Sequence, residues 1–178
     1  MTTYRWRGLA TGSVEHLDLD LREGVLRARS LVDLGPERIE YAMELTPAWE
    51  FRGLRLWSTA GRQLDLDRDA AGAWRVDGAE RSDLAGAVDV DLSFSPFTNT
   101  LPVRRLALAV EAAADIVAAY VDGATFEVTP DPQRYTRPSA DRYVYESRDS
   151  DFLREITVDA DGFVVDYPGL FVRLPDDG

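Results

Sequence analysis

The side chains that could do chemistry in this chain gather in one stretch, residues 89–106. An alternating acidic segment opens it, a polar run rich in threonine follows, and two adjacent arginines close it. If the acidic segment is a strand, Asp89 and Asp91 project from one face ~7 Å apart. Such a pair could act as general acid and base, clamp a metal ion, or accept hydrogen bonds from Arg104 and Arg105.

The same acidic alternation recurs at residues 17–21 and 64–67, where it is typical of a strand with one solvated face. The period alone therefore favours a solvated face for the aspartates of the first stretch too. Residues 89–92 differ from these two segments in the residues that follow them: Thr98, Asn99 and Thr100 offer hydrogen-bond donors and acceptors beside two guanidinium groups. A polar helix packed inside a sheet would need the same buried partners, so a purely structural role stays open.

Two further patterns could indicate metal or nucleophilic chemistry. Residues 65–69 and 159–162 have the acidic spacing of a calcium loop, but they lack the glycine and glutamate positions of an EF-hand. His16 is the only histidine, and no Gly-x-Ser-x-Gly elbow accompanies it. We therefore expect no metal site, no cofactor and no catalytic triad.

Composition excludes other classes of function. The 178 residues contain no cysteine, and all 20 basic residues are arginine, which excludes thiol nucleophiles, disulfides, lysine Schiff bases and P-loops. A net charge of −12 argues against a nucleic-acid partner, because phosphate binding needs a basic face. No apolar run reaches the ~20 residues of a membrane span, and residues 1–6 lack the apolar core of a signal peptide. The sequence predicts a cytoplasmic protein without a membrane span.

Glycine turns divide the chain into short segments with period-two alternation, which predicts a mainly β, mostly antiparallel protein in a single domain, residues 1–178. Trp6, Trp49 and Trp74 are expected in its core. The alanine-rich segment 109–120 has helical propensity, but it contains β-formers and runs into an Asp-Gly turn, so we favour a strand. The acidic end, residues 175–178, is expected to fray.

One short helix is predicted at residues 95–101. Ser95 suits the N-cap, Pro96 suits the first helical position, and Pro102 should close the helix. On a strand beyond it, Arg104 and Arg105 would point to opposite faces. We expect one of them to pair inward with an aspartate of the acidic segment, and we favour Arg105.

Several stretches of the chain resemble the bacterial family described as "putative glycolipid-binding". The resemblance spans nearly the whole chain, and its most specific part is the uncommon run Pro-Phe-Thr-Asn-Thr-Leu-Pro. The matching stretches are residues 89–92, 95–106, 133–135, 143–147 and 158–168, with a looser match at Trp6, Gly12, Glu15, Trp49 and Arg52. The resemblance implies a spiral β-roll, one long antiparallel sheet around a short central helix, often as a dimer.

Three functions follow as hypotheses. The first is a non-enzymatic binding protein for an amphipathic ligand such as a glycolipid, which requires an apolar cavity of several hundred Å³. The second is a structural or regulatory homodimer without a small ligand, and the third is a sugar or phosphoester hydrolase that uses Asp89 and Asp91. The candidate ligand-binding residues are Asp89, Asp91, Thr98, Asn99, Thr100, Arg104, Arg105, Tyr135 and Tyr145.

Overall fold

Short strands with alternating burial make up most of the molecule, as the period-two pattern predicts. The structure is a computed structural model that describes residues 1–175; the frayed end predicted for residues 175–178 falls almost entirely outside this range. Strands account for 55% of the chain and helix for 7%. The mainly β fold is thereby confirmed.

The strands of the first half are β1 (Thr2–Gly8), β2 (Val14–Arg22), β3 (Val25–Asp33), β4 (Arg38–Leu45), β5 (Phe51–Ser58), β6 (Gln63–Arg68), β7 (Trp74–Val76) and β8 (Ala79–Glu80). A 3₁₀ turn, η1 (Ser82–Leu84), leads into the second half. Its elements are β9 (Asp89–Leu92), helix α1 (Phe97–Leu106), β10 (Ala113–Val121), β11 (Val128–Ser139), β12 (Arg142–Ser147), β13 (Leu153–Val158), β14 (Val164–Tyr167) and β15 (Phe171–Arg173).

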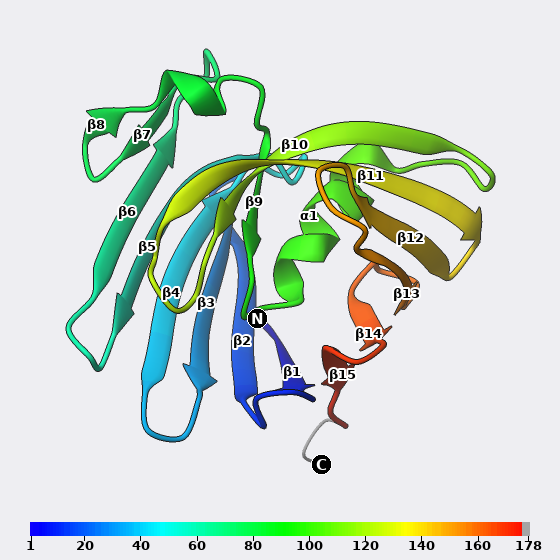
Figure 1. Cartoon of the computed structure of the whole chain (residues 1–178), viewed down its shortest axis with the longest axis horizontal. Helices are drawn as coiled ribbons and strands as arrows, with labels where there is room; N and C mark the ends of the chain where they lie inside the picture. The colour runs from blue at the N-terminus through cyan, green and yellow to red at the C-terminus, as the bar shows by residue number, and fades with distance from the viewer. Residues whose placement is uncertain (176–178) are drawn as a thin grey trace.

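Within residues 1–175, fifteen strands form one sheet in the order β8-β7-β6-β5-β4-β3-β2-β1-β15-β14-β13-β12-β11-β10-β9. The chain winds outward from β1 to β8, crosses to the opposite edge and winds back to β15, which pairs with β1. The sheet does not close, and Figure 1 shows it curving around α1. This is the spiral roll that the resemblance implies.

One strand pair departs from the antiparallel sheet that the sequence predicts. Strands β9 and β10 run parallel, with Ala118 opposite Asp89. The chain leaves β9, passes through α1 and returns to the same edge, and a crossover through a helix places the two strands parallel. The other strand pairs in the described part of the chain are antiparallel.

Helix α1 starts later and ends later than predicted. Its N-cap is Pro96, although the Ser95 hydroxyl still accepts a hydrogen bond from the Phe97 N–H at 3.3 Å. Pro102 lies inside the helix and does not close it, because residues 97–103 are all buried and their burial outweighs the one backbone hydrogen bond that proline lacks. The helix ends at Leu106, and the next residue, Ala107, caps it in the left-handed conformation with a φ of 44°.

The alanine-rich segment forms strand β10, so the choice of strand over helix is confirmed. The strand begins at Ala113 and lies between β9 and β11, where pairing on both sides overrides the helical propensity of alanine. The three predicted core tryptophans are buried: Trp6 and Trp74 almost completely, and Trp49 at 9% exposure. None of the helices within residues 1–175 has the length and apolar character needed to cross a membrane.

Candidate ligand-binding site

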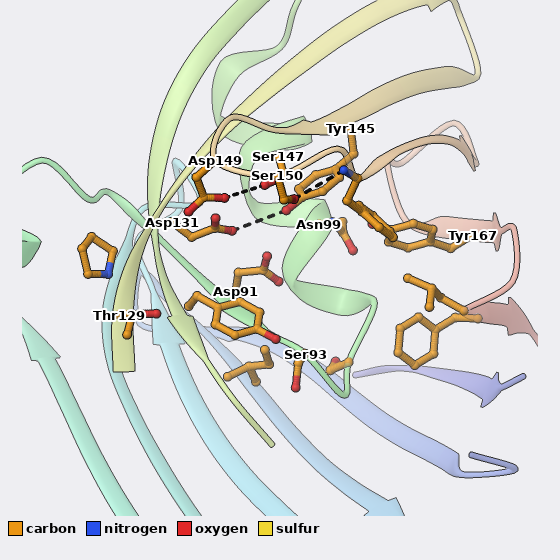
Figure 2. Close-up of a pocket in the computed structure, with 17 residues that line it drawn as sticks. Asp91, Ser93, Asn99, Thr129, Asp131, Tyr145, Ser147, Asp149, Ser150 and Tyr167 are labelled. Carbon is orange, nitrogen blue, oxygen red and sulfur yellow. Dashed lines mark hydrogen bonds between the residues drawn. The ribbon is translucent and has the colours of Figure 1, made fainter. Parts of the chain in front are cut away.

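A cavity of about 510 Å³ lies between helix α1 and the second half of the roll. Its walls come from β9, the loop before α1, β10, β11, β12, the turn after β12, and the β14–β15 hairpin. Figure 2 shows Asp131 and Asp149 on one side of this space, Tyr167 on the other, and Asp91 near the middle. The volume meets the requirement for a small amphipathic ligand, but the lining is only partly apolar.

Three carboxylates form the polar side of the cavity. The Gln133 amide donates one hydrogen bond to Asp91 at 2.8 Å and another to Asp131 at 2.7 Å, so it bridges the two groups. Asp91 also accepts from the Thr98 hydroxyl at 3.2 Å. Asp149 accepts from a serine hydroxyl of β12 at 2.7 Å. These hydrogen bonds position the three carboxylates, all of which line the same cavity.

Asp91 and Asp131 lie in a poorly solvated part of the cavity, whereas Asp149 is exposed. Burial raises the pKa of Asp91 to about 6, hydrogen bonds from Gln133 and Thr98 oppose the shift, and the nearby charge of Asp131 adds to it. Burial also raises the pKa of Asp131. Negative charge therefore accumulates here at a cost in free energy, and that cost would fall if a positive group or hydrogen-bond donors entered.

Aromatic side chains form much of the rest of the lining, from Tyr145 beside Asp131 to Tyr167 on the other side of the cavity (Figure 2). Tyr145 packs edge-on against Phe152 with ring centroids 5.8 Å apart, and it approaches Tyr167 at 6.5 Å. Tyr167 in turn lies 6.3 Å from Phe171. A second cavity of about 420 Å³ shares Phe171 and Leu170 as lining residues with the first. The aromatic side thus continues toward a second hollow, which lies beside the turns of the first half of the roll.

Asn99 projects from α1 into the first cavity (Figure 2). It is 5% exposed, and its amide nitrogen donates to the Tyr135 hydroxyl at 3.0 Å. The expectation that Asn99 is buried and bonded to the surrounding strands is confirmed. Within residues 1–175 the side-chain hydrogen bond found for Asn99 is this one, donated by its nitrogen, so the amide oxygen is an acceptor on the helix side of the cavity.

Replacing Asn99 with leucine should lower the free energy of unfolding by about 1–3 kcal/mol, because the Tyr135 hydroxyl would stay buried without its partner. Urea denaturation of the two proteins measures the difference. Unchanged stability would mean that the Asn99–Tyr135 bond contributes nothing to the fold, and that Asn99 serves the cavity alone.

The structure divides the predicted ligand-binding residues between the cavity and other places. Asp91, Asn99 and Tyr145 line the cavity, and two others support it from behind, Thr98 at Asp91 and Tyr135 at Asn99. The remaining four do not line it: Asp89, Thr100, Arg104 and Arg105. Whether any of the nine residues binds a ligand remains a prediction.

The two arginines lie elsewhere because they belong to the last turn of α1 and not to a strand, so the predicted strand geometry is wrong. Arg105 turns inward and pairs with the buried Asp89, as we expected of one of the two, with its Nη2 2.5 Å from Oδ2. Arg104 is exposed, and its guanidinium lies 5.1 Å from the centre of the Trp49 ring and donates to the carbonyl of Asp161.

Sequence reasoning missed Asp131, Asp149 and Tyr167 in the cavity, and Glu15 beneath it. Tyr167 and Glu15 had a signal, because both belong to the parts of the chain that match the family resemblance. Glu15 shares its strand face with the apolar leucines of β2, and a charged residue in that position is a sign of a buried carboxyl. It accepts a hydrogen bond at 2.8 Å from each of three hydroxyls, those of Ser30, Tyr41 and Ser95.

Comparison with protein families identifies the chain. The model of the family described as "Putative glycolipid-binding" matches residues 3–173. The chain belongs to this family. Its fold is shared with a solved structure, a DUF1089-family protein from Pseudomonas aeruginosa, at a TM-score of 0.76 and 34% sequence identity over 91% of this chain and 92% of that one. A search of the curated proteins gives no match.

The family description supports a binding role in general terms. The cavity is one of several hollows of about 420–520 Å³ among the described residues. Its carboxylates do not form a metal centre: within residues 1–175 no three His, Cys, Asp or Glu side chains make a group that could hold an ion. The polar and aromatic sides of the cavity instead offer hydrogen bonds, charge and stacking surfaces.

Proposed function

We propose that this member of the family is a binding protein for an amphipathic small molecule such as a glycolipid. The observation that carries the proposal is the division of the 510 Å³ cavity into a carboxylate side and an aromatic side. A polar head would lie among Asp91, Asp131 and Asp149. The apolar part would pass along Tyr167 and Phe171.

The second cavity supports an elongated ligand. It holds about 420 Å³, and Leu170 and Phe171 belong to the lining of both hollows. Ile39 and Phe94 provide apolar surface in it. A hydrocarbon chain that leaves the first cavity along the β14–β15 hairpin would therefore meet further apolar surface before reaching solvent, and burying it would stabilise the complex by about 0.8 kcal/mol per methylene.

The two alternative functions have less support. A hydrolase that uses Asp89 and Asp91 needs both groups on one substrate, but Asp89 is held by Arg105 and does not line the cavity. A homodimer without a ligand would need a broad apolar face. The large exposed apolar side chains within residues 1–175 include Trp57 on β5 and Leu153 on β13, which are far apart in the sheet order.

Native mass spectrometry of the protein purified from its own host tests the proposal directly. A retained amphipathic molecule would appear as added mass that is lost on denaturation. Isothermal titration of delipidated protein with octyl β-glucoside, below its micelle concentration, gives a second measurement with a defined probe. No added mass together with no binding of the alkyl glycosides described below would refute the proposal.

A variant that fills the cavity should weaken this binding. Ser150 lines the cavity from the exposed turn after β12, so Ser150→Trp should place an indole in the hollow without disturbing the core. We expect at least about a tenfold loss of octyl β-glucoside affinity, the equivalent of one or two lost contacts. Ser82→Trp, at an exposed position of η1 outside the cavity, is the matched control and should bind like the wild type. Equal binding by both variants would place the ligand elsewhere.

A further inference from the structure

The polar side of the cavity is negatively charged, and no positively charged side chain balances it there. Asp91, Asp131 and Asp149 all contribute to its lining, which contains no arginine. The two arginines expected beside a headgroup, Arg104 and Arg105, belong to α1 but not to this cavity. An anionic headgroup would therefore face like charges in a poorly solvated space, which is unfavourable.

A second observation on the helix side leads to the same ligand chemistry. The amide oxygen of Asn99 is an acceptor without a partner among the described residues, on a side chain that is 95% buried and projects into the cavity (Figure 2). The amide nitrogen gives one of its two hydrogens to Tyr135, and the amide oxygen is left to accept from a ligand. Because carboxylates and an amide oxygen all accept hydrogen bonds, a ligand rich in hydrogen-bond donors would fit between them.

The aromatic side offers a third feature that suits a cation. Tyr145 and Tyr167 are both buried, and both line the cavity next to the carboxylates. The Tyr145 hydroxyl lies 3.4 Å from Asp131 and donates toward it. Tyrosine rings attract an ammonium group through their negative faces, and the attraction increases when the group is shielded from water.

From these features we infer that the headgroup bound in this cavity carries a protonated amine, as in an amino sugar or an amino alcohol. The inference rests on the proposed function and narrows its ligand class. The ammonium group would lie between Asp91 and Asp131, with the Asn99 oxygen as an additional acceptor. Neighbouring hydroxyls of the head would donate to Asp149.

Three alkyl glycosides that differ at one position test the inference: octyl β-glucoside, octyl 2-amino-2-deoxy-β-glucoside and the N-acetyl derivative of the latter. Isothermal titration near neutral pH compares them with delipidated wild-type protein. We expect the amine to bind about tenfold or more tightly than the other two, and the preference to shrink as salt is added. Equal or weaker binding of the amine overturns the inference.

Two variants assign the preference to the carboxylates. Asp131→Asn and Asp149→Asn should each reduce the ratio of amine to hydroxyl affinity severalfold, because each removes one negative charge from the lining. Asp149 is exposed, so its replacement leaves the fold intact even if that of Asp131 does not. Asp18→Asn, on an exposed position of β2 outside this cavity, is the control that should keep the full ratio. A ratio that is unchanged in both cavity variants contradicts the inference.

The outcomes also separate this inference from the proposed function. If octyl β-glucoside binds as well as the amine, the charge preference is wrong while an amphipathic ligand site remains. If none of the three glycosides binds and the protein from its own host carries no added mass, both proposals fail. Preferred binding of the amine, lost in the cavity variants, supports both.

Discussion

Replacing Arg105 with alanine should destabilise this protein by about 3–5 kcal/mol, because it leaves the buried carboxylate of Asp89 without its counter-ion. Asp89 is 1% exposed, and Arg105 donates to both of its oxygens, from Nε at 3.0 Å and from Nη2 at 2.5 Å. Burial raises the pKa of Asp89 even with the guanidinium beside it. The carboxylate therefore depends on Arg105 to remain charged in this position.

Urea denaturation of the wild type, Arg105→Ala and Arg104→Ala provides the measurement. Arg104 is exposed, so its loss should cost about 1 kcal/mol or less. Adding Asp89→Asn to Arg105→Ala should recover part of the lost stability, since the unpaired charge is then gone. Equal stability of the two arginine variants would show that the buried carboxylate of Asp89 does not depend on Arg105.

As the pH rises from about 4 to about 8, the free energy of unfolding of the wild type should fall by about 3 kcal/mol relative to that of the Glu15→Gln variant. Glu15 is buried, and burial raises its pKa from 4.5 to about 7, although hydroxyl donors partly oppose the shift. Its second carboxylate oxygen has no hydrogen-bond partner among the described residues.

The sign of this effect follows from proton binding. Because the folded-state pKa is above the unfolded one, the folded protein holds an extra proton between the two values. Stability is therefore greatest below the unfolded pKa and declines as the pH rises through the folded one. Glutamine cannot titrate, so the free energy of unfolding of the variant lacks this contribution.

Denaturation of both proteins across this pH range isolates the Glu15 contribution, because the other titrating groups cancel in the difference. A difference that does not change with pH would show that Glu15 keeps an ordinary pKa. Ser13→Ala is a useful companion, since Ser13 lies one residue before β2 and is buried without titrating. Its difference from the wild type should not depend on pH.

Much of the fold could be predicted from local patterns. Alternation of apolar and polar residues places one strand face inward wherever it occurs, so the mainly β architecture was readable from segments such as residues 17–21. The length of α1 was not, because the prediction relied on the usual effect of Pro102. Burial of the helix on several sides outweighed one missing hydrogen bond, and burial depends on the whole roll.

The site was only partly readable for the same reason. The run at residues 96–102 drew attention to Asn99, and the acidic alternation drew attention to Asp91. Asp131 and Asp149 reach the same cavity from positions 40 and 58 residues beyond Asp91, with no local pattern to mark them. Distances of that kind are set by the strand order and by the curvature of the sheet.

The sequence by itself determined the strand-rich composition, the core tryptophans and the family. It could do so because side-chain periodicity and a specific motif are properties of neighbouring residues. Only the tertiary structure decided which charges share a space. Helix α1 extends through Arg105, and successive side chains on a helix are about 100° apart, whereas those on a strand alternate between two faces. In this geometry Arg105 pairs with Asp89, and the carboxylates that line the cavity have no arginine beside them in its lining.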